Sequence, residues 1–530
     1  MRRIVTWALA LCCLTVISGS TLERLPRAQQ RNPIDLPNPD LPNPDVPNPI
    51  VVENSREGTS DWRIEDAAQN HEVEGYASAT SVAPGQTISF FVNVRSRSGP
   101  HPYTLEVFRL GWYGGLGGRR MAGPYLRPGI VQPPPHVDPT THLVECDWHS
   151  PFTLTIPTGW VSGVYLVRLV EHGFGKGSYI PFVVRRDGPS DILFQQAVTT
   201  YHAYNPWGGH ALYKGSSVNG VIAQVVSFNR PYGYTAKTTA MVEREPALSR
   251  GTGFLFWWDI NALRFLEREG YDVSYSTNID THRRPADLLR HRVFLSVGHD
   301  EYWSTPMRNN LEAALAAGVN LAFLGSNPIY WRVRLIQSPI SRALDRTMVA
   351  YKNQACVDDP WYLDAYPSND ERITTKWRDS CTTSQSRRPE AALVGVQWLG
   401  GMTLDMDTPM IVTNTHHWAF QGTGLQTGDS LYGLAGYEVD SVVPRVSPSN
   451  IEVLAASPIP DVPPSHMTIY EAASGALVFA TGTMNWNWGL DGFNPDGDDA
   501  VCCYAFTPKA TRVSAAVQQI TRNVLDRMLQ

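Results

Sequence analysis

Four side chains that can transfer protons or bind a metal ion stand next to one another behind an apolar run. The stretch "SVGHDEYW" contains His299, Asp300, Glu301 and Tyr302 in direct succession. An imidazole, two carboxylates and a phenol are suited to general acid–base catalysis, and the oxygens among them suit a hard cation. Each group also has a structural explanation, because an acidic residue can cap the next helix and Tyr302 can belong to the core. The pattern therefore predicts a site without proving one.

The segments around this stretch predict where it lies in the fold. Val293–Val297 has the apolar composition of a buried strand, and Ser304–Gly318 has the N-cap serine and the final glycine of a helix. Val319–Asn327 is the next apolar strand. Alternating strands and helices indicate a parallel, doubly wound sheet, in which ligands bind beyond the carboxyl ends of the strands. We expect the four side chains in that crevice.

Other strand ends should contribute to the same crevice. The strand Asp191–Thr199 leads into a predicted loop, Thr200–Tyr213, and later strands end in asparagine and tryptophan. Amides would orient a substrate, and aromatic rings would wall the pocket. The substrate-binding candidates are Tyr204, Asn205, Trp207, Asn327, Asn485 and Trp486.

Glu438 is a further candidate because it stands on an otherwise apolar strand, where a buried carboxylate needs a partner. No serine elbow of the GxSxG kind and no cysteine follows a strand, so an acyl-enzyme mechanism is not supported.

The first twenty residues predict an export signal. Two arginines precede an apolar run that ends at small residues, and this run is too short to span a bilayer comfortably. Residues 21–60, with the repeat "LPNPDLPNPDVPNPI", are predicted to be a proline-rich disordered linker. We therefore expect a secreted protein, extracellular or periplasmic after cleavage of the signal.

Two folded domains should follow the linker. Residues 61–186 show short alternating runs between turns, which is typical of an immunoglobulin-like β-sandwich. Residues 190–530 form the predicted α/β domain, interrupted at about 335–430 by a polar segment that we interpret as inserted loops. The fold class is thus α/β, with a sandwich followed by a doubly wound parallel sheet.

Charge and cysteine content narrow the partners. The net charge of −6, with no basic block beyond the first residues, excludes a nucleic-acid footprint. In an oxidising compartment Cys356 and Cys381 are the preferred disulfide pair, and Cys502 or Cys503 could reach Cys146. The absence of a CxxC spacing argues against a zinc site made of cysteines.

From about Gly75 onward the chain resembles the N,N-dimethylformamidase large-subunit family. The resemblance is carried by "VFRLGWYGGLGGR", "TYHAYNPWGGHALY", "LEREGYDVSYSTNID", "VFLSVGHDEYWS", "GVNLAFLGSNPIYWR", "GLAGYEVD" and "GTMNWNWGLD". It implies a C-terminal domain similar to class I glutamine amidotransferases without their cysteine. It also implies a mononuclear iron, held by two tyrosines and one glutamate, that activates water to cleave an amide.

The resemblance implies particular ligands and roles. Tyr302 matches one iron tyrosine and Glu438 is the candidate glutamate, whereas Tyr201 and Tyr204 are both open for the second tyrosine. Glu301 would act as general base and His299 as acid or oxyanion donor.

Other interpretations stay open. Asp300 and Glu301 could serve a metal-free hydrolase, or the chain could be a secreted, non-catalytic protein that binds carbohydrate or cell wall. The expected partners are a small amide or a glycan-like molecule, together with a small partner subunit or further copies of the chain.

Overall fold

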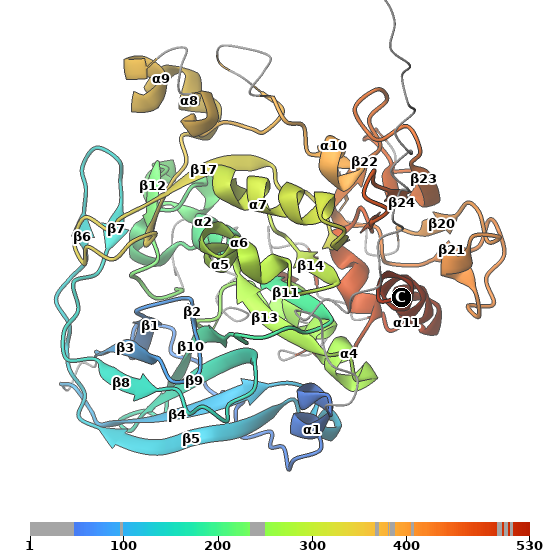
Figure 1. Ribbon diagram of the computed structural model, residues 1–530. Helices are drawn as coiled ribbons and strands as arrows, with labels where there is room; N and C mark the ends of the chain where they lie inside the picture. The colour runs from blue at the N-terminus through green and yellow to red at the C-terminus, as the bar shows by residue number, and fades with distance from the viewer. Residues whose placement is uncertain are drawn as a thin grey trace, which may run out of the picture. The chain divides into compact units, whose positions relative to one another are not determined.

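Strand-rich sheets with flanking helices make up a mixed α/β structure (Figure 1). The computed structural model describes residues 47–95, 99–233, 250–365, 370–379, 381, 387–403, 408–459, 461–494, 501–502, 507–508 and 512–530. The predicted signal peptide and most of the predicted linker lie outside these residues.

The end of the predicted linker is helical, not disordered. Pro49–Asn54 forms α1, in which Asn48 caps the first turn by accepting from the Ile50 amide. Asn48 also donates to the carbonyl of Gly270, and Ile50 is fully buried. The proline content of the linker predicted an extended chain, but a proline in the first turn is compatible with a helix once an apolar side chain has a core to enter.

Within residues 73–184, two larger sheets share a core, and a separate pair joins β6 (His136–Val137) to β7 (Val144–Glu145). The first has the order β1 (Val73–Ala77), β3 (Thr87–Val94), β8 (Phe152–Thr155). The second has the order β2 (Ser81–Val82), β10 (Gly177–Val184), β9 (Gly163–Glu171), β4 (Tyr103–Leu110), β5 (Gly118–Arg127). Phe90 of the first sheet and Phe182 of the second belong to one hydrophobic cluster, with ring centroids 5.3 Å apart. The predicted strands of this region exist, and its assignment as immunoglobulin-like stays a prediction.

A mixed sheet forms the centre of the C-terminal part (Figure 1). Five neighbouring strands are parallel: β13 (Val273–Thr277), β11 (Ile192–Gln196), β14 (Val293–Gly298), β16 (Asn320–Gly325) and β25 (Leu477–Ala480). Four more continue the sheet in antiparallel pairs: β24 (Ser465–Glu471), β23 (Glu452–Ser457), β20 (Met410–Val412) and β21 (Ser430–Leu431). The three strands named from the sequence are found as β11, β14 and β16, whereas the doubly wound, glutamine amidotransferase-like assignment stays a prediction.

Several helices surround this sheet and cover its strands. The longer ones are α4 (Ile260–Glu269), which ends at the left-handed Gly270, α7 (Thr305–Ala316), capped by Ser304, and α11 (Ala515–Met528). The shorter ones are α2 (Val198–Tyr204), α5 (Asn278–Arg283) and α6 (Pro285–Leu288). Among the described helices, none has the length and the apolar composition that crossing a bilayer requires.

The region 335–430 is more ordered than the prediction of inserted loops allowed. A four-stranded sheet joins β12 (Val225–Ser227), β18 (Thr347–Val349), β17 (Trp331–Ile336) and β15 (Tyr302–Ser304), and a separate pair joins β19 (Gln397–Thr403) to β22 (Tyr437–Ser441). The short helices are α8 (Ala355–Asp358), α9 (Pro360–Ala365) and α10 (Ala391–Val394). Strands this short show no measurable period, so pairing with distant segments defines them.

The predicted disulfide between Cys356 and Cys381 is confirmed, with Cα atoms 5.3 Å apart. The suggestion that Cys146 pairs with Cys502 or Cys503 is wrong, because Cys146 is a buried free thiol. Cys503 lies outside the described residues.

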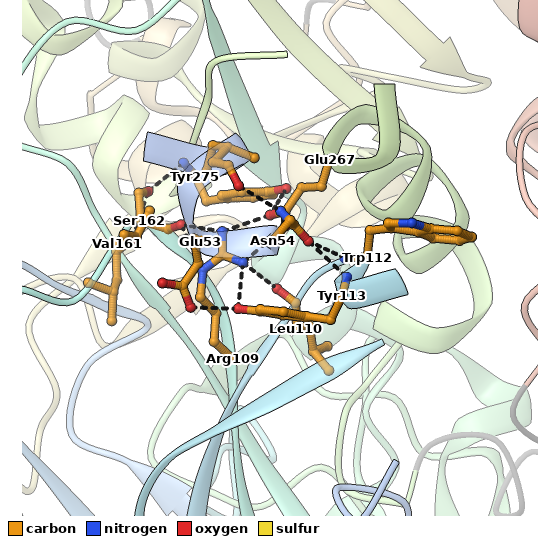
Figure 2. A network of polar contacts seen from close by, with 12 residues as sticks. Glu53, Asn54, Arg109, Leu110, Trp112, Tyr113, Val161, Ser162, Glu267 and Tyr275 are labelled. Atoms are coloured by element: carbon orange, nitrogen blue, oxygen red, sulfur yellow. Dashed lines mark hydrogen bonds and ion pairs between the residues drawn. The ribbon is translucent and has the colours of Figure 1, made fainter. Parts of the chain in front are cut away.

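A buried ion pair connects the N-terminal sheets to the α/β part (Figure 2). Arg109 of β4 donates from its two terminal nitrogens to both carboxylate oxygens of Glu267 of α4, over 3.0 and 2.8 Å, and both side chains are fully buried. The Glu267 carboxylate also accepts from Asn54 of α1 and Tyr275 of β13. Donors from β4, α1 and β13 thus converge on the one carboxylate of Glu267, which fixes α4 against the second sheet (Figure 2).

Candidate functional site

The chain leaves β14 through a glycine that no other residue could replace easily. Gly298 has a φ of +67°, and a Cβ added there would lie 2.4 Å from Cβ of Trp258. After this sharp turn His299–Glu301 cross from the central sheet to β15, where Tyr302 pairs with Trp331 of β17. Two sheets thus hold the two ends of the predicted catalytic stretch.

The hydroxyl groups of two tyrosines meet at the carboxylate of Glu301. The hydroxyl of Tyr204 donates to Oε2 of Glu301 over 2.9 Å, and that of Tyr213 lies 2.9 and 3.0 Å from the two carboxylate oxygens. The two hydroxyls lie 3.0 Å apart, and their rings stack with centroids 4.2 Å apart. Two phenols and one carboxylate therefore place their oxygens around a common point.

A second group of polar side chains adjoins this one through His299. Its Nε2 lies 3.3 Å from Oε2 of Glu301 and 3.4 Å from Oε2 of Glu438. Asn327 donates from Nδ2 to the same oxygen of Glu438 over 2.9 Å. The imidazole thus stands between two carboxylates, all of them buried.

The electrostatics of these groups follow from burial and from one another. Burial pushes the pKa of His299 down, but the nearby carboxylates of Glu301 and Glu438 outweigh it, so the pKa is raised. Burial raises the pKa of Glu438 to about 7, aided by Glu301 and opposed by His299. Glu301 has a lowered pKa, because His299 and the Lys352 ammonium outweigh its burial. Glu301 is therefore ionised at neutral pH, and the proton of Glu438 is easily lost.

Lys352 and Tyr302 complete the surroundings of Tyr213. The Lys352 ammonium lies 3.4 Å from the centroid of the Tyr213 ring, and burial lowers its pKa to about 8. The hydroxyl of Tyr302 donates to that of Tyr213 over 2.6 Å. Burial raises the pKa of both Tyr204 and Tyr213 well above the ordinary value for a phenol. A phenolate would form there only beside added positive charge.

The side chains described so far form one connected group, called the cluster around Glu301 below: Tyr204, Tyr213, His299, Glu301, Tyr302, Asn327, Lys352 and Glu438. Asp300 and Tyr201 lie outside this cluster. The Asp300 carboxylate accepts from Gln195, Ser296, Asn278 and Trp303, all within 3.0 Å. These four bonds hold the turn together. Tyr201, predicted as a metal ligand with Tyr302 and Glu438, donates its hydroxyl to Asp259. The three predicted ligands are thus not gathered around one point: Tyr302 joins the cluster through Tyr213, and Glu438 joins it through His299.

The predicted substrate-binding residues divide into two sets. Tyr204 and Asn327 belong to the cluster, as described above. Asn205 instead donates to the carbonyl of Pro231, beyond β12, and accepts from the amide of Trp207, whose side chain donates to Glu74 of β1. Trp486 donates to Thr521 of α11 and is fully buried. Asn485 is also buried, and its Oδ1 has no hydrogen-bond partner within the described part of the chain.

The sequence prediction missed Tyr213 and Lys352. Tyr213 ends the motif "TYHAYNPWGGHALY", so its position in that motif was a usable signal. The segment was predicted to be a loop throughout, but it begins in α2, and the fold of the chain after α2 stacks the Tyr213 ring on that of Tyr204. Lys352 follows β18 within the supposed insertion, and no local pattern connects it to the site.

The donor set fits an ion that prefers oxygen ligands. Among the described residues, no three histidines, cysteines, aspartates or glutamates form a metal-binding group. The phenol oxygens of Tyr204 and Tyr213 and the carboxylate of Glu301, which are 2.9–3.0 Å apart, form such a set with tyrosine included. Separations of this size are compatible with three ligands of one small ion bound at about 2 Å from each.

Two bacterial proteins named N,N-dimethylformamidase beta subunit are similar to this chain. The one from Paracoccus aminophilus is 27% identical over 219 residues, which cover 36% of this chain and 28% of that protein. The one from an Alcaligenes species is 25% identical over 221 residues, which cover 36% of this chain and 29% of that protein. The matched part thus spans less than a third of the length of these relatives.

One solved structure matches part of the chain but gives no information about its fold. The PKD domain of an M14-like peptidase from a Thermoplasmatales archaeon matches 21% of this chain and 87% of its own at 17% identity. Its TM-score is 0.12, too low to indicate a shared fold.

The longest match is to a protein family. The family model described as "N,N-dimethylformamidase beta subunit-like, C-terminal" matches residues 104–499, which include every member of the cluster around Glu301. Because this match covers well over half of the sequence, the chain belongs to the N,N-dimethylformamidase beta subunit-like, C-terminal family.

Proposed function

We propose that this chain hydrolyses a carbon–nitrogen amide bond at the cluster around Glu301. Membership of the family and the similarity to two N,N-dimethylformamidase beta subunits support an amidohydrolase. The observation that carries the proposal is the convergence of the Tyr204, Tyr213 and Glu301 oxygens beside a histidine.

Tyr204, Tyr213 and Glu301 are the residues that would hold iron. This revises the ligand set expected from the sequence, in which the candidates were Tyr302, Glu438 and either Tyr201 or Tyr204. Iron bound there would supply a Lewis acid, which polarises an amide carbonyl and lowers the pKa of water. Burial keeps both phenols protonated in its absence, so binding of the ion has to displace their protons.

The surrounding residues would tune this ligand set. Tyr302 donates to the oxygen of Tyr213 and would stabilise it as a phenolate. The Lys352 ammonium, above the same ring, offsets part of the negative charge that two phenolates and Glu301 bring together. Neither residue needs to contact the ion.

His299 and Glu438 are the groups that would move protons. The imidazole lies within 3.4 Å of both Glu301 and Glu438, so it can exchange a proton with either carboxylate. Glu438, with its pKa of about 7, can accept a proton from the attacking water and return one to the leaving amine. Asn327 fixes the orientation of Glu438 by its bond to Oε2. Glu301, proposed above as a ligand, is then not the general base expected from the sequence.

The remaining expectations from the sequence are kept as part of this proposal. They are export after removal of residues 1–20 and a small amide as substrate. Association with a partner subunit is also proposed, since the relatives are named as beta subunits. The non-catalytic, carbohydrate-binding alternative loses two of its expected stacking platforms, because Trp207 and Trp486 are buried.

Iron content per chain tests the ligand set directly. We expect near-stoichiometric iron in the protein purified from an iron-supplied host, and its loss in Tyr204→Phe, Tyr213→Phe and Glu301→Gln. Tyr201→Phe is the matched control, which should retain iron because Tyr201 bonds Asp259 outside the cluster. Iron retained by all three cluster variants would refute this assignment.

Release of amine from a panel of small amides, including N,N-dimethylformamide, tests the reaction. His299→Ala and Glu438→Gln should retain iron and lose about 10²–10⁴-fold in turnover, the usual contribution of general acid–base catalysis. If iron-loaded protein cleaves no amide in the panel, the metal site stands and the amidase proposal fails.

A further inference from the structure

A small cavity lies between the N-terminal sheets and the helix that carries Tyr204. Its walls come from β1 and β10 on one side, and from α2 and the segment after β12 on the other. The cavity volume is about 30 Å³. About 10–15 Å³ is enough for one water molecule, so this space holds a ligand of only a few atoms.

Two buried arginines line this cavity without a carboxylate partner. Among the described residues, Arg230 donates to three backbone carbonyls, those of Trp207, His210 and His202, over 2.8–3.3 Å. Its side chain lies almost completely out of solvent, at 1% exposure. Among the described residues, no carboxylate forms an ion pair with this guanidinium. A buried charge in this condition normally requires a counter-ion.

Arg346, which also lines the cavity, is in a similar condition. It donates to the carbonyls of Ala77 and Phe228, over 2.7 Å each, and to Oδ1 of Asn229 over 2.9 Å. Asn229 separates it from the carboxylate of Glu145, to which the amide donates. Burial lowers the pKa of both Arg230 and Arg346 to about 10, so both are cations at neutral pH.

Among the described residues, no carboxylate lines the cavity, and the buried carboxylate of Glu145 acts on Arg346 from outside the lining, beyond Asn229. Burial raises the pKa of the Tyr76 and Tyr232 phenols and of the adjacent Cys146 thiol, so all three are neutral. Burial also lowers the pKa of His202 well below its ordinary value, which leaves a neutral imidazole. Among the described residues that line the cavity, the charged groups are thus the two guanidinium groups.

Three buried polar atoms in the cavity wall also have no hydrogen-bond partner among the residues that the structure describes. They are Nε2 of Gln196, Nε of Arg230 and Nδ1 of His202, on side chains that are at most 3% exposed. The first two are obligatory donors, and a neutral imidazole nitrogen can donate in one tautomer. Unpaired buried donors are costly, and a bound acceptor would satisfy them.

We infer that this cavity binds a small monovalent anion, such as a short carboxylate or a halide, between Arg230 and Arg346 with Gln196 as a further donor. The volume excludes sugars and nucleotides, and the donors offer nothing to a cation. The inference does not depend on the proposed amidase activity, because it rests on residues outside the cluster around Glu301.

Anion-dependent thermal stability of the full chain tests this site. Sodium formate and sodium chloride are titrated at constant ionic strength against sodium gluconate, whose anion is too large for the cavity. A ligand at ten times its Kd shifts the unfolding equilibrium about elevenfold toward the folded protein. We expect the Tm to rise and saturate with formate, chloride or both, and formate ahead of chloride would identify a carboxylate site. Equal Tm values in all three salts would overturn the inference.

Gln196→Glu is the informative variant because it places a carboxylate of nearly the same shape in the cavity wall. It should raise the Tm in gluconate and abolish the response to small anions, since the protein then carries its own counter-ion. Gln337→Glu, at an exposed position, is the matched control and should respond as the wild type does. An undiminished response in Gln196→Glu would mean a general salt effect and would refute the site. If that variant does not fold, a bromide-soaked crystal decides, through the presence or absence of an anomalous peak in the cavity.

Discussion

Replacing Glu267 by glutamine tests whether the buried ion pair holds the N-terminal sheets to the α/β part. The substitution keeps the shape of the side chain and removes its charge. The carboxylate accepts from both terminal nitrogens of Arg109, from Asn54 and from Tyr275 (Figure 2). A glutamine offers one oxygen, so at least two of these donors lose their acceptor.

The magnitude follows from the complete burial of the pair. Arg109 and Glu267 both have side chains with 0% exposure, so water cannot solvate the guanidinium left behind. Removing one partner of a buried ion pair costs about 3–5 kcal/mol. We expect Glu267→Gln to lower the free energy of unfolding by about 4 kcal/mol.

Urea unfolding, followed by tryptophan fluorescence, measures this change from the shift in midpoint at unchanged slope. Glu269→Gln is a matched control on the same helix. Glu269 pairs with Arg268 and Arg522 at 21% exposure, and such partly exposed pairs contribute about 1 kcal/mol or less.

A double replacement separates charge from packing. Changing both Arg109 and Glu267 to methionine removes the uncompensated charge and should recover part of the stability lost in the single variant. A loss below about 1 kcal/mol in Glu267→Gln, or one equal to that of Glu269→Gln, would contradict the role of this pair.

Three further predictions concern the site and its supports. Glu438, with its pKa raised from 4.5 to about 7, contributes stability below pH 4.5 that is lost as the pH rises through 7, amounting to about 3 kcal/mol. The Tm of metal-free Glu438→Gln should therefore rise relative to that of the wild type as the pH increases from 4.5 to 7. A difference in Tm between the two proteins that does not change with pH would contradict this assignment. Cys356→Ala should cost about 3 kcal/mol through the loop of 25 residues, and reduction of the wild type should reproduce this loss in unfolding experiments. Gly325→Ala should cost about 3 kcal/mol in the same assay, since a Cβ would lie 2.0 Å from the Gly298 carbonyl oxygen, whereas Gly159→Ala, with open space around it, should leave stability nearly unchanged.

The predicted site and the observed cluster share their centre but differ in their outer members. His299, Glu301 and Tyr302 were adjacent in the sequence, and the fold keeps them together across the turn from β14 to β15. Asp300, from the same stretch, faces the other way and ties the turn to Gln195 and its neighbours. The side to which each residue of an irregular turn points cannot be predicted from the sequence, because neither the strand period nor the helix period applies there.

The positions of the strand ends indicated the edge of the sheet at which the cluster lies, but they did not indicate which side chains belong to it. Tyr204 and Asn327 follow strands of the parallel half of the sheet and lie in the cluster. Asn205 and Trp207 stand one and three residues beyond Tyr204, yet Asn205 bonds the backbone beyond β12 and Trp207 bonds β1. The end of a strand limits a segment to one edge of the sheet, whereas the side chain direction depends on the backbone dihedrals that follow.

The sequence alone determined the features that depend on local pattern. The apolar run and cap signals set β14, α7 and β16, the residues flanking a polar segment indicated the disulfide, and ordered motifs indicated the family. Only the tertiary structure decided which oxygens meet. Tyr213 joins Glu301 because the chain after α2 folds its ring onto Tyr204, and Lys352 approaches from β18 across 139 positions of sequence from Tyr213. Contacts over such separations depend on the packing of whole sheets, and no local periodicity records them.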